Sequence, residues 1–320
     1  MRFTLAGLVL AMVPAMLNAQ APSAVGGIHP NTEERIVRPL RYQPRGDAFV
    51  IHNGVERFNR PLYGGNTAFR VDGGDQPEFV LYLPGRGGNL RFALRSGNQT
   101  RWLHAAADIT SGYRPGELFY EIRDPMLGER GELSISALAY ADTEGVIVQV
   151  SSRGVSSGVE LLWAFGGVNG QRGRRDGDIG TEAVPISEWF EPKPEFAADD
   201  RIELTKAGSF KLDAKVATLV GVTSLPVEMQ IANADDWDRP AELFAALRES
   251  RRAAPAKPLV IGALPLNAES VYLSVQRIGG NEGSAKELDV YDAVTAKRQQ
   301  RDAPLGAVKL AAEFPAASLA

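Results

Sequence analysis

Ile109–Ile122 reads ITSGYRPGELFYEI, and this stretch decides the fold. Two runs of apolar and β-branched residues, 109–113 and 118–122, flank the tetrapeptide Arg114-Pro115-Gly116-Glu117. Proline and glycine suit the two central positions of a tight turn. The stretch therefore predicts two antiparallel strands joined as a hairpin.

The same pattern recurs on both sides of this hairpin. Strand-like runs are joined by turn signals at regular intervals, and no alternation of strands with helices is present, which excludes a Rossmann-type fold. We expect a mainly β protein, an antiparallel β-sandwich. The expected hairpin pairs are 67–71 with 78–83 around Asp72-Gly73-Gly74, 133–140 with 146–150, 201–204 with 210–213, and 217–223 with 227–232 around Ser224-Leu225-Pro226. Single strands are expected at 48–52, 89–95, 159–165, 259–264 and 271–278. The strand 48–52 is followed by Asn53-Gly54, a type I′ hairpin signal.

Helices are expected only late in the chain. Residues 241–252 are rich in Ala, Leu, Glu and Arg, with Asp238 as the expected N-cap and Pro240 in the first turn. Residues 284–301 form a second expected helix with one apolar face.

The N-terminus has the form of a secretory signal peptide. Arg2 precedes the apolar run 3–17, and Leu17-Asn18-Ala19 predicts cleavage after Ala19. The run is too short for a membrane span, and no later segment is long enough. We expect a signal peptide (1–19), a disordered leader (20–33), a β-sandwich domain (34–280) and a linker helix leading toward a further domain (281–320), in a periplasmic or secreted protein.

Composition excludes several kinds of chemistry. The chain has no Cys, which excludes disulfides and thiolate ligands, and its net charge of -4 argues against nucleic acid as a partner. The three histidines, His29, His52 and His104, leave little room for a metal site, and the last two are expected at strand positions as structural or surface residues. We expect neither a metal nor a cofactor.

A glycine-rich loop follows the strand 159–165, with the sequence WAFGGVNGQRGRRDGDIG at 163–180. Such a loop at a strand end is a candidate binding site. The alternative is a solvated loop whose Arg and Asp side chains pair with each other. Trp163 has an alternative place in the core, and Trp189 is equally well explained as buried or as a platform for a sugar ring. The substrate-binding candidates are Trp163, Arg174, Arg175, Asp176, Asp178 and Trp189.

Catalytic residues cannot be assigned from spacing. A glycosidase needs two carboxylates across the scissile bond. Nothing selects a pair from the available candidates, and the serine-hydrolase, P-loop and zinc-protease motifs are absent from the sequence. The candidate carboxylates are Asp108, Glu117, Glu121, Asp124, Asp176 and Asp178.

Several motifs together resemble a bacterial family of unknown function found in exported proteins of polysaccharide-degrading bacteria. They are RYQPRGDAFVIHNG at 41–54, RFNRPLYG at 57–64, LPGRGGNL at 83–90, YEIRDP at 120–125, and WAFGG at 163–167 with RDGD at 175–178. The resemblance implies a β-supersandwich of the galactose-mutarotase type, a linker helix and a C-terminal (α/α)6 barrel of glycosidase type. In that architecture the loop 166–178 would lean over the active-site cleft of the barrel.

The resemblance also implies a function and a partner. We expect an exported, glycan-associated accessory domain of a glycoside-hydrolase-like protein, with an oligo- or polysaccharide as its partner. The barrel is absent from the 320 residues of the sequence. Two alternatives therefore remain: a stand-alone carbohydrate-binding module, or a truncated or split glycosidase or polysaccharide lyase. Helix 284–301 would then mediate self-association or bind a partner chain.

Overall fold

The computed structural model describes residues 40–65, 68–83, 85–141, 143–171, 190–206, 208–249, 254–266 and 270–278. The chain divides into two units, 1–40 and 41–320, and all the elements named below belong to the second unit. The second helix expected from the sequence, 284–301, lies outside the described residues. Within the described part of the chain, no helix is long and apolar enough to span a membrane.

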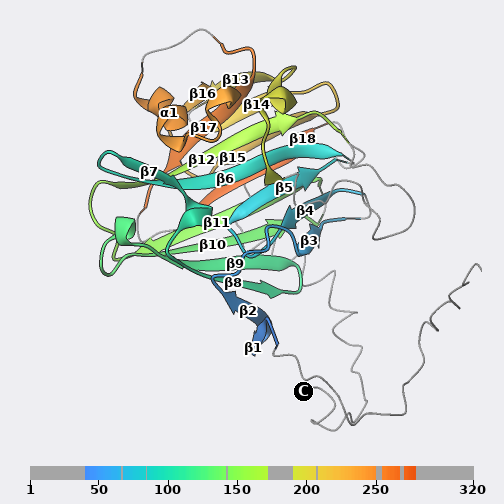
Figure 1. Cartoon of the computed structure of the whole chain (residues 1–320). Helices are drawn as coiled ribbons and strands as arrows, with labels where there is room; N and C mark the ends of the chain where they lie inside the picture. Colours follow the sequence, from blue (N-terminus) through green and yellow to red (C-terminus); the bar gives the residue numbers. More distant parts are fainter. Residues whose placement is uncertain are drawn as a thin grey trace, which may run out of the picture. The chain divides into compact units, whose positions relative to one another are not determined.

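Ten strands of the described residues form one antiparallel sheet, here called sheet A (Figure 1). In their order across the sheet they are β1 (Gln43–Arg45), β2 (Ala48–His52), β8 (Asp108–Arg114), β9 (Glu117–Arg123), β10 (Glu132–Ala139), β11 (Gly145–Arg153), β18 (Val271–Ile278), β15 (Thr218–Thr223), β14 (Ser209–Asp213) and β13 (Arg201–Lys206).

The second sheet, sheet B, contains eight strands of the described residues. Its order is β16 (Met229–Asn233), β17 (Pro258–Leu264), β12 (Val159–Val168), β6 (Arg86–Ser96), β5 (Glu78–Tyr82), β4 (Arg70–Gly73) and β3 (Arg60–Tyr63), while β7 (Gln99–Trp102) also pairs with β6. The expected fold class, a mainly β antiparallel sandwich, is confirmed.

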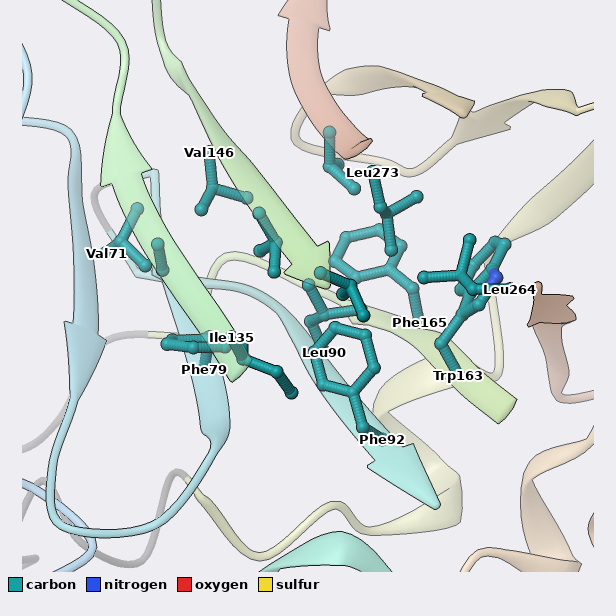
Figure 2. Close-up of a cluster of buried hydrophobic side chains, with 14 of the residues drawn as sticks. Val71, Phe79, Leu90, Phe92, Ile135, Val146, Trp163, Phe165, Leu264 and Leu273 are labelled. Atoms are coloured by element: carbon teal, nitrogen blue, oxygen red, sulfur yellow. The ribbon is translucent and has the colours of Figure 1, made fainter. Parts of the chain in front are cut away.

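The main core lies between the two sheets, because alternate side chains of each strand point inward. Figure 2 shows Val71, Phe79, Leu90, Phe92, Trp163 and Phe165 of sheet B together with Ile135, Val146 and Leu273 of sheet A. Trp163 is fully buried, and its ring lies 5.9 Å from that of Phe210 on β14. A large apolar core is what a chain without cysteine needs for stability.

The hairpin at the centre of the sequence argument is confirmed. Arg114 pairs with Glu117 across the turn between β8 and β9, and Gly116 has a φ of 83°, a conformation that glycine adopts without strain. The expected pairs β4–β5, β10–β11 and β13–β14 also form antiparallel hairpins.

Two expected turns are not hairpins. The strand before Asn53-Gly54 pairs with β1 and β8, and the Asn53 N–H donates to the carbonyl of Ile109, so the dipeptide ends a strand without returning it. Ser224-Leu225-Pro226 connects β15 of sheet A to β16 of sheet B. This turn signal marks a crossing between layers, because each of the two strands finds its partners in a different sheet.

A short helix, α1 (Pro240–Ala245), continues as a 3-10 turn (Ala246–Arg248) and ends before residue 252. Its N-cap is Arg239 and not Asp238, because the carbonyl of Arg239 accepts the first helical hydrogen bond, from the Leu243 N–H. The apolar side of α1 contributes Leu243 and Phe244 to a second cluster, on the outer face of sheet B, with Trp102 and Trp237.

Candidate functional site

A polar groove lies on the outer face of sheet A, across β2, β8, β9, β10 and β11 (the strands from blue to green in Figure 1). It has two lobes, of about 700 Å³ and about 820 Å³. The first lobe lies over the strands. The second extends over the 3-10 turn Pro125–Leu127 and residues 128–131, and the two lobes share Asp108, Arg123, Glu132 and Arg153. We refer to both lobes together as the sheet A groove.

The register of the strands places the polar side chains of the groove in two rows. Inward positions such as Ile122, Leu133 and Val150 are apolar, and the side chains between them point outward because strand side chains alternate. Paired residues then stand opposite one another on neighbouring strands. The first row is His52, Thr110, Glu121, Ser134 and Ser151, and the second is Asp108, Arg123, Glu132 and Arg153.

Glu132 lies between two guanidinium groups in the second row. Arg123 Nε donates to Glu132 Oε1 at 2.8 Å, and Arg153 donates to the other carboxylate oxygen. These hydrogen bonds, from Arg153 first and from Arg123 second, lower the pKa of Glu132. The two arginines therefore stabilise the charged form of Glu132 in the groove.

Glu121, in the first row, forms a two-point ion pair with Arg45. The two nitrogen–oxygen distances are 3.0 and 3.3 Å. The guanidinium of Arg45 lies 5.9 Å from the ring centre of Phe119, and that of Arg114 lies 4.8 Å from it. The Phe119 ring covers Gly112, where a Cβ would lie only 2.2 Å from the ring. Glycine at this position lets the aromatic ring lie flat on the sheet.

His52 and Asp108 form the edge of the groove at β2 and β8. His52 Nδ1 lies 3.4 Å from Asp108 Oδ1 and 3.5 Å from Thr110 Oγ1, and the His52 and Asp108 side chains are 63% and 43% exposed. The pair is thus open to a ligand. The prediction of a surface histidine at a strand position is confirmed for His52, whereas His104 lies in the 3-10 turn Leu103–Ala105.

Asp124 has a structural role at the second lobe. Its buried carboxylate accepts hydrogen bonds from the N–H groups of Ala107 and Met126, each at 2.9 Å, and pairs with Arg101. These bonds fix the loop that follows β9. Of the carboxylates considered from the sequence, Asp108 and Glu121 line the first lobe, Asp124 lines the second, and Glu117 pairs with Arg114 outside the groove lining.

Most residues of the predicted loop site lie outside the described residues: Arg174, Arg175, Asp176, Asp178 and Trp189. Trp163 is placed in the core, the alternative that its apolar strand favoured, and has no exposed surface. The described residues next to the loop are firmly held. The Val168 N–H donates to Asp200 at 3.0 Å, and the Phe190 carbonyl accepts from both Arg57 and Arg91.

A buried charge cluster on sheet B holds Phe190. Glu78 is 1% exposed, and its carboxylate lies 2.6 Å from Arg57 Nε and 2.9 Å from Arg91 Nε. His104 is near the same carboxylate, at 3.9 Å, and burial lowers the pKa of its imidazole against the raising effect of Glu78. The cluster connects β5, β6 and the residues that follow the predicted loop.

Sequence reasoning missed Arg123, Glu132, Ser134, Ser151 and Arg153 as site residues. A signal for four of them was present in Glu132-Leu-Ser-Ile-Ser136 and Ser151-Ser152-Arg153, where polar residues occupy the outward positions of strands. Exposed polar residues on a sheet are ordinarily plain surface. Only the strand register shows that these residues face the same groove as His52 and Asp108.

Two of the solved structures that are similar to this chain belong to larger proteins. One is a bacterial glucoamylase complexed with acarbose, 9% identical, covering 76% of this chain and 37% of its own, with a TM-score of 0.49. The other is described as a kojibiose phosphorylase from the human microbiome, 11% identical, covering 87% of this chain and 37% of its own, with a TM-score of 0.33. The chain thus spans little more than a third of each structure.

No curated protein sequence matches the chain. One family model matches residues 83–294, which is more than half of the sequence and covers β6 to β18. The matched region contains every residue that lines the sheet A groove except His52. The chain belongs to the family described as Domain of unknown function (DUF4450).

Proposed function

We propose that this chain is a glycan-associated β-sandwich domain that binds an oligosaccharide in the sheet A groove. The observation that carries the proposal is the two-row array of hydroxyl, carboxylate and guanidinium groups in an open groove. A sugar presents many hydroxyls, each of which both donates and accepts hydrogen bonds. Serine and threonine hydroxyls do the same, while carboxylates accept and guanidiniums donate, so the array offers partners of every kind.

The length of the groove favours an oligosaccharide over a single sugar. The first row crosses five strands, from His52 on β2 to Ser151 on β11. Neighbouring strands lie about 4.8 Å apart, so this row is roughly 19 Å long. The second lobe extends the binding surface beyond the ends of the strands.

The described groove supports binding better than hydrolysis. A glycosidase needs one carboxylic acid that can donate a proton to the leaving group. Glu132 is held as an anion by two arginines, and Glu121 is paired with Arg45. Neither carboxylate is arranged as a proton donor. This pairing supports a binding role for these two carboxylates, in an accessory or stand-alone binding domain.

The proposal includes export and the glycine-rich loop. The signal-peptide pattern of residues 1–19 supports an exported protein with cleavage expected after Ala19, and mass spectrometry of the mature chain tests this. The resemblance at 163–178 supports the loop as a second contact to the glycan. Alanine at Arg175, Asp176 and Asp178 is expected to weaken binding by a larger protein that carries the barrel, and unchanged binding there would remove the loop from the proposal.

The groove itself is tested by filling it. Ser134 is exposed near the middle of the first row, and Ser134→Trp would occupy the space between Glu121 and Ser151. Glycans that bind the full chain are first identified on an array. We expect Ser134→Trp to bind them with at least tenfold lower affinity than the wild type, measured by calorimetry.

Ser157→Trp is the matched control, because Ser157 is also exposed but lies outside the lining of both lobes. It is expected to leave the affinity unchanged. Equal affinity of both variants and the wild type would place the ligand elsewhere. Product analysis on the same hits separates a binding domain from an enzyme.

A further inference from the structure

The sheet A groove and the arginines paired with it contain equal numbers of positive and negative charges. Five carboxylates line its two lobes, and three arginines line them with the carboxylates: Asp108, Glu121, Asp124, Glu129 and Glu132, with Arg123, Arg130 and Arg153. Two further arginines, Arg45 and Arg101, pair with lining carboxylates from the side. With His52 neutral, the groove and its paired arginines carry no net charge.

Three of the five carboxylates have arginine partners. Glu132 holds Arg123 and Arg153, Arg45 holds Glu121, and Arg101 holds Asp124. A uronate that bound Arg123 or Arg153 would compete with Glu132 for the guanidinium. A neutral ligand can use the remaining lone pairs and N–H groups without separating any of these ion pairs.

From this arrangement we infer that the groove selects uncharged oligosaccharides and discriminates against uronic-acid polymers, and that Glu132 enforces the selection. Glu132 is the carboxylate that two groove arginines share. Without its charge, Arg123 and Arg153 would face the ligand unpaired. Guanidiniums bind carboxylates strongly through paired N–H···O bonds, so the variant groove would accept a uronate. The inference rests on the proposed function and adds to it the class of ligand.

The experiment compares two classes of tetrasaccharide on the full chain. The neutral probes are cellotetraose, xylotetraose, mannotetraose and maltotetraose, and the anionic probe is tetragalacturonate. The proteins are the wild type, Glu132→Gln and the control Glu203→Gln, which removes the same charge from an exposed position on β13, outside the groove lining. Circular dichroism first checks that the three proteins are equally folded.

We expect the wild type to bind a neutral probe and to bind tetragalacturonate at least tenfold more weakly. Glu132→Gln is expected to gain at least tenfold in affinity for tetragalacturonate, with the gain reduced by added salt, whereas Glu203→Gln gains none. Wild-type preference for tetragalacturonate, or equal gains in the two variants, would overturn the inference and leave the proposed function intact. Binding of no probe by any of the three proteins would overturn both.

Discussion

Asp200 is a buried carboxyl group that connects pH to the stability of the β12 end. Asp200 is 6% exposed, and its carboxylate accepts a hydrogen bond from the Val168 N–H. Burial raises its pKa to about 7, against the lowering effect of the Val168 and Gly167 N–H groups. In an unfolded chain an Asp titrates near about 3.9. Between these pH values the folded chain binds more protons, so the free energy of unfolding falls as pH rises from about 4 to 7.

Asp200→Asn is expected to remove this pH dependence. The amide oxygen of the new side chain can still accept a hydrogen bond from the Val168 N–H. The amide side chain carries no charge at any pH. The thermal midpoint of the variant, relative to wild type, should rise between pH 4 and pH 7.5 and then level off. Asp47→Asn, at a position that is 76% exposed and does not contribute to the pKa of Asp200, serves as the control and should follow the wild type closely. Parallel profiles for wild type and Asp200→Asn would show that Asp200 does not titrate in this range.

At the residue scale, sequence reasoning reached some side chains of the groove and missed others for a physical reason. Asp108 and Glu121 were among the carboxylates considered, and both line the groove. Nothing in the sequence could select them from the rest, because the choice depends on which strands are neighbours. Ser134 and Ser151 are brought together by the β10–β11 register alone, and each looks like plain surface by itself.

At the scale of the elements, the cluster around Glu78 connects β5, β6 and the residues that follow the predicted loop. Glu78→Gln would leave Arg91, whose side chain is 7% exposed, without a full counter-charge. Removing one partner of a buried ion pair typically costs about 3–5 kcal/mol. We expect a loss of that size in the free energy of unfolding, measured by urea denaturation.

The control for this prediction is Glu56→Gln. Glu56 pairs with Arg41, and both side chains are about half exposed, at 50% and 47%. Exposed pairs add little to stability, so the control should unfold almost as the wild type does. Similar unfolding curves for the two variants would mean that the Glu78 cluster does not hold the sheet together.

The elements that could be predicted are those made of local contacts. Hairpins such as β8–β9 and β10–β11 are specified by a turn and the two runs beside it. The pairs Val146–Val275 and Gly221–Val275, by contrast, bring β18 between two strands distant in sequence. No turn signal encodes such pairings, and this is why Ser224-Leu225-Pro226 was mistaken for a hairpin turn.

At the scale of the whole molecule, ligand binding should stabilise the entire sandwich. The groove crosses five strands of a sheet whose inner face forms the main core. Unfolding of the core would therefore destroy the groove, so the ligand binds only the folded state. Free ligand at 100 times Kd adds about 2.7 kcal/mol to the free energy of unfolding. A bound neutral tetrasaccharide should therefore raise the thermal midpoint in proportion to the logarithm of its concentration.

The Ser134→Trp variant should show a clearly smaller rise at the same concentrations. A rise of equal size in the variant would mean that the sugar stabilises the protein from a site other than the groove. Fluorescence-monitored melting of both proteins at several ligand concentrations is sufficient for the comparison.

The position of β18 in sheet A has a consequence for folding while the protein is being synthesised. β11 and β15 are neighbours in the finished sheet only through β18, although β11 is synthesised much earlier. At usual rates of translation the interval is on the order of ten seconds. During that time the half-sheet ending at β11 carries an open edge of unpaired N–H and C=O groups, which can capture another chain. We therefore expect the nascent protein to be prone to association through this edge until Val271–Ile278 is synthesised and joins the two halves.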